Sequence, residues 1–395
     1  MEFGKNNTPF STEEFASRVS KTKQRMAAAG LDAMICSDPA NMNYLTGYNG
    51  WSFYVHQCVM VLQDFEQPLW LGRGQDVNGA KLTTVLPADN ILGYDDNFVQ
   101  SKTLHPMQEV ARHLSARGLS AGRIGVEADS YYFTGRSLDV LRSEMPNATI
   151  VDADGLVNWV RAVKSDAEIG LMQQAARITE KIMQTAVDRI GVGVRQCDVA
   201  ADIQAAGARG TPEYAGDYPA IVPLMPSGVG TSGPHITWLD EPFAGQTGTT
   251  IEIAGVRHRY HVPMTRTVYL GTPPQKMVDA AKVVVEGIHA ALDVAKPGVG
   301  SRDVHAAWTA TIARHGLVKD SRCGYSIGLN YPPDWGERTI SLRGNDETIL
   351  EPNMTLHFMP GIWLDDWGIA ISEAIRITET GVEAFCDFPR ELFIK

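Results

Sequence analysis

The segment at residues 249–271 constrains the fold more than any other part of this chain. Its sequence, TTIEIAGVRHRYHVPMTRTVYLG, contains two β-rich runs. Long helical patterns, such as residues 276–298 (KMVDAAKVVVEGIHAALDVAKPG), alternate with these runs and with later ones. Long helices packed on curved antiparallel hairpins are typical of an α+β domain. The segment also places Glu252 in mid-strand between apolar residues, where a carboxylate is costly unless it is paired or functional.

Length and patterning predict two domains. With 395 residues, 44% of them hydrophobic, the chain is long enough for two cores. Residues 1–163 alternate helical and strand patterns, which indicates a smaller α/β domain. A long helical pattern follows, with Ser165 as its N-cap and Glu168 three residues later, the spacing of a capping box. We therefore expect an α+β domain over residues 164–395.

The bulk charge and the apolar runs exclude several classes of protein. A net charge of -11 without a basic run argues against nucleic-acid binding, because phosphate contacts need clustered lysine and arginine. No run of eighteen apolar residues and no signal-like start are present, so we expect no membrane span and a cytoplasmic protein. The five cysteines are widely spaced without a CxxC, which favours reduced thiols. A small molecule is the expected partner.

An aromatic segment in the first domain is a candidate ligand surface. Residues 41–57 (NMNYLTGYNGWSFYVHQ) combine aromatic residues with asparagine and glycine, a composition suited to a loop. Tyr44, Trp51 and Tyr54 of this segment are candidates for stacking on a cation or a flat ligand. The alternative is a small hydrophobic core made of the same side chains.

The order of motifs in the second domain resembles a known superfamily. In chain order the motifs are RAVKSDAEI, a Pro/Gly loop with His235, IEIAGVRHRYHVPMTRTV, GYSIG, LEPNMTLHFMPGIW and WGIAISEAIRIT. This order is similar to that of the pita-bread superfamily, which includes methionine aminopeptidase, aminopeptidase P, prolidase and creatinase. The resemblance covers nearly the whole chain and implies a pita-bread second domain behind a creatinase-type first domain.

The metallopeptidases of this superfamily hold two metal ions with two aspartates, one histidine and two glutamates. The matching positions of this chain are Glu252, Pro263, Tyr325, Met359 and Ser372. Hard divalent ions need several anionic oxygens and imidazole, which proline, methionine and tyrosine do not supply. We therefore expect no catalytic metal and no other cofactor.

Within the superfamily, the chain most resembles the ectoine hydrolase family. The segments that carry this resemblance include LTGYNGWSFYVHQC, GDYPAIVP, RCGYSIGLNYPPDWGERTISLR and the ending CDFPRELFIK. The resemblance implies metal-independent hydrolysis of the cyclic amidine ectoine to an N-acetylated 2,4-diaminobutyrate, with hydroxyectoine left open as a substrate. It also implies a homodimer in which the aromatic segment completes the partner's active site. The alternatives are an amidinohydrolase acting on creatine, a peptidase with an unusual metal set, and a non-catalytic binding module.

The resemblance also suggests roles for individual residues. Glu252 is expected at the floor of the pocket, where it either attacks the amidinium carbon or anchors the amidinium. His235 matches a pocket histidine and can act as a base and then as an acid. Glu373 is a third catalytic candidate, but in a regular strand it points away from Ser372, so only one of these two side chains lines the site.

Further side chains are expected to bind the substrate. Tyr325 and Met359 replace metal ligands and fill the former metal volume, either as ligand contacts or as plain packing. Arg322 and Arg338 are candidates for a substrate carboxylate, because a guanidinium matches it with two parallel donors. Trp335 lies in a segment near the predicted pocket.

Overall fold

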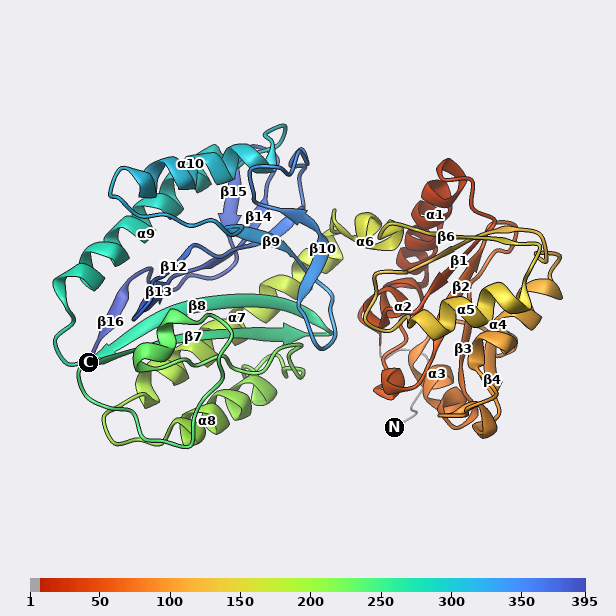
Figure 1. Cartoon of the computed structure of the whole chain (residues 1–395), viewed down its shortest axis with the longest axis horizontal. Helices are drawn as coiled ribbons and strands as arrows, with labels where there is room; N and C mark the ends of the chain where they lie inside the picture. Colours follow the sequence, from red (N-terminus) through yellow and green to blue (C-terminus); the bar gives the residue numbers. More distant parts are fainter. Residues whose placement is uncertain (1–7) are drawn as a thin grey trace. The chain divides into compact units, whose positions relative to one another are not determined.

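The computed structural model describes residues 8–395, which form two compact units that meet between residues 161 and 162 of the chain. Figure 1 follows the chain through both units. The sequence analysis placed the boundary two residues later, after residue 163. None of the helices among residues 8–395 combines the length and the apolar character that crossing a bilayer requires. All five cysteines are unpaired, as the sequence predicts.

The first unit is built on one six-stranded sheet with the order β4-β3-β2-β1-β5-β6. Its strands are β1 (Ala33–Cys36), β2 (Cys58–Leu62), β3 (Leu69–Arg73), β4 (Ile91–Tyr94), β5 (Arg123–Val126) and β6 (Thr149–Asp152). Its helices are α1 (Thr12–Ala28), α2 (Pro39–Thr46), α3 (Val77–Thr83), α4 (Pro106–Ser115), α5 (Gly135–Glu144) and α6 (Leu156–Arg161). The sheet is mixed, because β1 and β2 pair antiparallel whereas β1 and β5 pair parallel.

The aromatic segment of this unit is only partly a loop. The helix α2 runs through Tyr44 and ends at Gly47, whose φ of 83° requires the left-handed conformation that glycine adopts easily. Tyr44 is buried in the core with the Arg18 guanidinium 4.5 Å from its ring centroid. Trp51, which precedes the 3-10 turn η1 (Ser52–Tyr54), and Tyr54, its last residue, are exposed by 56% and 68%. The predicted loop surface therefore begins after Gly47.

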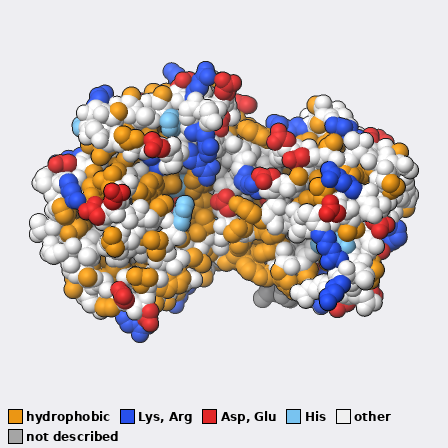
Figure 2. Space-filling view, viewed as in Figure 1, with side chains coloured by type: hydrophobic (Ala, Val, Ile, Leu, Met, Phe, Trp, Pro, Cys, Tyr) orange, Lys and Arg blue, Asp and Glu red, His pale blue; other side chains and the backbone are white. Residues whose placement is uncertain are grey.

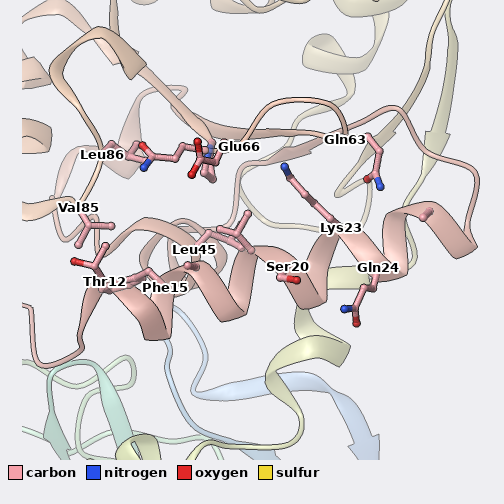
Figure 3. Close-up of a pocket in the computed structure, with 15 residues that line it drawn as sticks. Thr12, Phe15, Ser20, Lys23, Gln24, Leu45, Gln63, Glu66, Val85 and Leu86 are labelled. Carbon is pink, nitrogen blue, oxygen red and sulfur yellow. The ribbon is translucent and has the colours of Figure 1, made fainter.

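A cavity of about 480 Å³ lies beside α1 in the first unit. Phe15 and Ser20 enter it from α1, and Leu45, Val85 and Leu86 come from other segments of the same unit (Figure 3). Its lining includes none of the side chains that the sequence analysis singled out.

The second unit packs long helices against curved antiparallel strands. Its helices are α7 (Asp166–Arg189), α8 (Gln196–Arg209), α9 (Gln275–Val294) and α10 (Ser301–Ala313), with the 3-10 turn η5 (Gly228–Ser232). Its strands are β7 (Thr247–Arg257), β8 (Tyr260–Leu270), β9 (Gly324–Ile327), β10 (Gly336–Ser341), β11 (Thr355–Phe358), β12 (Gly361–Trp363), β13 (Gly368–Ala370), β14 (Glu373–Ile377), β15 (Val382–Ala384) and β16 (Leu392–Ile394). Helices α9 and α10 lie on one side of the strands, and α7 and α8 on the other (Figure 1).

Three sheets form the strand layer: β10-β9-β11-β14-β15, β16-β8-β7 and β12-β13. Strands β7 and β8 pair antiparallel over their full length and place Glu252 opposite Thr265. His258 and Arg259 turn the hairpin with φ values of 46° and 70°, the sign that tight two-residue turns require. Gly255 lets β7 cross α7, because a Cβ there would lie 2.4 Å from the backbone of that helix.

Helix α7 begins as the sequence predicts. The Ser165 hydroxyl accepts a hydrogen bond from the Glu168 backbone N–H at 3.3 Å, and the Glu168 carboxylate accepts one from the Ser165 N–H at 2.8 Å. This capping box satisfies two backbone donors that a helix start leaves without partners. It fixes the helix on which the hairpin β7–β8 rests.

Candidate active site

Glu252 is a buried carboxylate without a direct partner. Its side chain, on β7, is 7% exposed, and within residues 8–395 it forms no hydrogen bond or ion pair. Burial and, second to it, the charge of Asp334 raise the pKa of Glu252, the Lys319 ammonium opposes this rise, and the resulting pKa is about 7. On the neighbouring edge, Leu224 exchanges two backbone hydrogen bonds with Glu252. The carboxylate is thus held by its strand and left available to a ligand.

Glu252 and Glu373, the two carboxylates among the catalytic candidates, lie in different environments. Glu373, on β14, is 1% exposed and accepts hydrogen bonds from Arg266 at 2.8 Å and from Arg390 at 3.1 Å. The Ser372 side chain instead joins a network around Tyr325 and His357. Of the two neighbours Ser372 and Glu373, it is Ser372 that faces the predicted site, and Glu373 forms an ion pair.

A buried hydrogen-bond network joins Tyr325 and Ser372, two of the positions that the sequence analysis matched to metal ligands. The Tyr325 hydroxyl accepts a hydrogen bond from Trp335 Nε1 at 2.8 Å and lies 3.0 Å from His357 Nδ1. His357 Nε2 lies 2.7 Å from Ser372 Oγ, which accepts from the Thr265 N–H at 2.7 Å. Strand pairing builds this contact, because Tyr325 on β9 stands directly opposite His357 on β11. Trp335 is itself buried, and its indole N–H holds the Tyr325 hydroxyl in place.

Burial sets the protonation of this network. The pKa of His357 falls to about 3, first through burial and then through the charges of Arg322 and Arg266. Its imidazole is neutral at physiological pH. Burial also raises the pKa of Tyr325 well above its ordinary value, and the negative charge of Glu252 adds to this effect. Tyr325 is consequently a protonated phenol close to the Glu252 carboxylate.

Lys319 is a second buried charge, which the sequence analysis missed. It lies between α10 and β9, is 8% exposed, and its ammonium has no hydrogen-bond partner within residues 8–395. The nitrogen lies 3.9 Å from the ring centroid of Trp363, a cation–π contact. Burial lowers the pKa of Lys319 to about 8, while Cys323 and Glu252 counteract this fall. No motif spacing distinguishes this lysine from a surface one.

The remaining predicted residues lie at varied depths. Arg322 is half-buried with its guanidinium 4.4 Å from the Tyr325 ring centroid, and it donates to Ser341 at 3.3 Å. Arg338 is exposed with a φ of 58°, and Met359 is half-buried. His235 is exposed in the loop after η5. Backbone pairing brings this loop near β7, because the Met225 N–H bonds to Ile236 O beside the Leu224–Glu252 bridge.

The residues at the superfamily's ligand positions do not fit a dinuclear metal centre. Glu252 is the sole carboxylate among the five, and the Tyr325 and Ser372 oxygens are engaged in the network with His357. No three His, Cys, Asp or Glu side chains of the described chain are grouped so that they could hold a metal ion. A hard divalent ion would lack the anionic oxygens that it requires here.

Figure 2 shows that apolar side chains gather on the face of this unit over β7, β8, β12 and β13.

Comparison with known proteins agrees with this architecture. The model of metallopeptidase family M24 matches residues 170–379, and the creatinase/prolidase N-terminal domain matches residues 18–163. The chain is 48% identical over 394 residues to the ectoine hydrolase of Halomonas elongata, covering 98% of both chains. It is 27% identical to the creatinase of Bacillus sp., covering 96% of this chain and 92% of that one.

The solved structures show the same fold. The prolidase from Pyrococcus horikoshii superposes with a TM-score of 0.79 at 21% identity, covering 95% of this chain and 100% of the prolidase. The second unit thus has the pita-bread fold and the first unit the smaller α/β fold that accompanies it, which confirms the predicted fold class. The chain belongs to metallopeptidase family M24, in its creatinase-like branch, and it is a hydrolase.

Proposed function

We propose that this protein hydrolyses the cyclic amidine ring of ectoine to an N-acetylated 2,4-diaminobutyrate. One observation carries the proposal: a buried, unpaired carboxylate, Glu252, stands at a metal-ligand position in a chain 48% identical to an ectoine hydrolase over 98% of its length. The substrate carries a delocalised amidinium cation and a carboxylate. A site for it should offer one anion and one cation without pairing them to each other.

The buried charges of the second unit match this requirement. Glu252 supplies the anion for the amidinium. Lys319, Arg322 and Arg338 are the candidate cations for the carboxylate, of which Lys319 is the most deeply buried. The Lys319 ammonium and the Glu252 carboxylate influence each other's pKa but form no ion pair, so each retains capacity for a ligand. Aromatic faces complete such a site, since they attract cations.

The reaction adds one water molecule across one ring C–N bond. In one route, His235 takes a proton from water, the resulting hydroxide adds to the amidinium carbon, and the C–N bond breaks as the proton passes to the leaving nitrogen. In the other route, the Glu252 carboxylate adds to that carbon, and the ring C–N bond breaks as the leaving nitrogen takes up a proton, which leaves an acyl-type intermediate on Glu252. Water then adds to the same carbon, its proton passes to His235, and the bond to Glu252 breaks and releases the free carboxylate. The amidinium charge already polarises the carbon. No step therefore needs a Lewis acid, which fits the donor set around Glu252.

The direct test is incubation of the purified protein with ectoine, with the product followed by NMR and by the appearance of a primary amine. Creatine and an X-Pro dipeptide with added Mn²⁺ or Co²⁺ are the matched alternative substrates. Turnover of creatine alone would identify an amidinohydrolase of another specificity. Metal-dependent dipeptide cleavage would support the peptidase alternative, and absence of all turnover with retained ectoine binding would support a binding module.

The role of His235 has its own test. General acid–base catalysis contributes about 10²–10⁴-fold, so H235A should lower kcat with ectoine by that factor. The matched control is H315A, because His315 is also partly exposed in this unit and pairs with Glu286 at 3.1 Å. A change of less than a few-fold in H235A would remove His235 from the mechanism.

We further propose that the protein acts as a homodimer with a composite site. The exposed Trp51 and Tyr54 are the candidates to cover the partner's Glu252, whereas the buried Tyr44 is not. Mixing W51A and E252Q proteins under exchange conditions should restore activity, because each mixed dimer regains one intact site. Failure of restoration with proven subunit exchange would contradict the composite site.

In a cytoplasmic setting, the predicted location, the five free thiols would remain reduced.

A further inference from the structure

The network around Tyr325 can hold its protons in two arrangements. Ser372 Oγ has two polar neighbours, the Thr265 N–H at 2.7 Å and His357 Nε2 at 2.7 Å. The Thr265 N–H is a donor, so the serine hydroxyl can donate its own proton only to His357 Nε2. The Thr265 hydroxyl oxygen is buried and bonded to nothing within residues 8–395, so it offers no alternative acceptor within reach.

The two arrangements differ in the tautomer of His357. A neutral imidazole has one N–H and one acceptor nitrogen. In the first tautomer Nε2 accepts from Ser372 and the proton of His357 stands on Nδ1, whereas in the second the Nε2–H donates to Ser372 Oγ and Nδ1 accepts from the Tyr325 hydroxyl. The Nδ1–H of the first tautomer donates to the Tyr325 hydroxyl oxygen at 3.0 Å. Burial holds the imidazole neutral at physiological pH, so His357 carries a single N–H in either arrangement.

In the first tautomer, Tyr325 is left as a donor without an acceptor. Its hydroxyl oxygen receives one hydrogen bond from Trp335 Nε1 at 2.8 Å and a second from His357, which uses its acceptor capacity. Its own proton must point in a third direction, where no described residue accepts it. A buried phenol with an unused proton is costly, and an oxygen atom from a ligand would satisfy it.

We propose that Ser372 and His357 are positioning residues that aim the hydroxyl proton of Tyr325 at an oxygen atom of the substrate bound beside Glu252. In the reaction proposed above, on which the identity of that oxygen rests, it is the oxygen that adds to the amidinium carbon. Its charge grows as the tetrahedral species forms. A preorganised donor aimed at such an oxygen lowers the barrier more than it strengthens substrate binding.

Kinetics separate this role from packing. Y325F should lower kcat by about 10²–10³-fold with a smaller change in KM, as expected for one lost donor to a developing oxyanion. S372A should give a kcat between those of the wild type and Y325F, because His357 is then free to carry its proton on either nitrogen. The double variant Y325F/S372A should be no slower than Y325F. S372T, which retains the hydroxyl, should recover the activity lost in S372A.

The matched control is S326A. Ser326 follows Tyr325 on β9 and is fully buried, as Ser372 is. It bonds to the Thr339 hydroxyl at 2.7 Å on the opposite face of the strand. Its removal should leave kcat unchanged. The positioning role would be overturned if the losses of kcat in Y325F and S372A multiplied in the double variant, or if S326A lost as much kcat as S372A.

The proton itself can be observed without any substrate. Long-range ¹H–¹⁵N spectra of ¹⁵N-histidine-labelled protein, with the His357 signal assigned by its loss in H357Q, should show the proton on Nδ1. Should H357Q fail to fold, neutron diffraction of the wild-type crystal gives the same answer. A proton on Nε2 would overturn the inference whatever the substrate. A proton on Nδ1 in a protein that does not hydrolyse ectoine would support the positioning of Tyr325 and refute the proposed function.

Discussion

Glu252 and Glu373 are two deeply buried carboxylates of the same unit, and they differ in their partners. Glu373 accepts hydrogen bonds from Arg266 and Arg390, and Arg266 also donates to Ser372 O at 2.6 Å and to Pro389 O at 2.6 Å. Glu252 has none of these contacts within the described chain. A buried charge that the fold has paired with two arginines serves the fold. One that the fold leaves unpaired, at a cost in stability, is a candidate for function.

Turnover should distinguish the two residues most sharply. E252Q removes the anion that holds or attacks the amidinium, and we expect kcat/KM with ectoine to fall on the order of 10³-fold or more. That loss corresponds to about 4 kcal/mol of transition-state stabilisation. E373Q, assayed below its melting temperature, should lose far less. Similar losses in both variants would erase the proposed distinction.

Stability should respond in the opposite order. In E373Q the Arg266 guanidinium, which is 0% exposed, loses its charge partner, and removal of one member of a buried pair costs about 3–5 kcal/mol. Urea unfolding followed by circular dichroism measures this loss. The double variant E373Q/R266M is the control, because it removes both charges and should recover part of the stability.

The sequence could predict the fold but only part of this contrast. The hairpin over 249–271, the capping box at Ser165 and the motif order all indicate the observed architecture, because each depends on local periodicity or spacing. Strand alternation also states that Ser372 and Glu373 face opposite sides. Which of them faces the site depends on Arg266 and Arg390, and residues so far apart in the chain show no common pattern.

His357 and Lys319 show a second limit of sequence reasoning. A lone histidine in the apolar run TLHF is a visible signal, but its partner Tyr325 becomes its neighbour only through the pairing of β11 with β9. Lys319 lies in a connection whose sequence, GLVKDSRC, is typical of a surface loop. Its burial beneath Trp363 results from the placement of β12 relative to that connection. Tertiary packing, rather than local pattern, places both residues.

The pH dependence of stability should single out Glu252. Its pKa is about 7 in the folded protein against an ordinary 4.5 in the unfolded chain, so the folded state binds the proton more tightly. Stability contributed by this group is present below pH 4.5 and is lost as the pH rises through 7. E252Q should therefore raise the free energy of unfolding above pH 7, by at most about 3 kcal/mol. The gain should vanish near pH 4, which urea unfolding at several pH values can verify.

Beyond any loss of substrate binding, K319M should produce a small shift in the acid limb of the activity profile. If Glu252 acts as an anion, kcat/KM rises as the pH passes through its pKa near 7, and the Lys319 ammonium helps to keep that pKa from rising further. K319M removes this charge and should shift the limb to higher pH by less than about one unit. The exposed Lys282 on α9 provides the control K282M, which should leave the limb in place. A shift to lower pH in K319M would mean that Lys319 does not support the charge of Glu252. The unpaired carboxylate would then need another source of stabilisation before substrate binds.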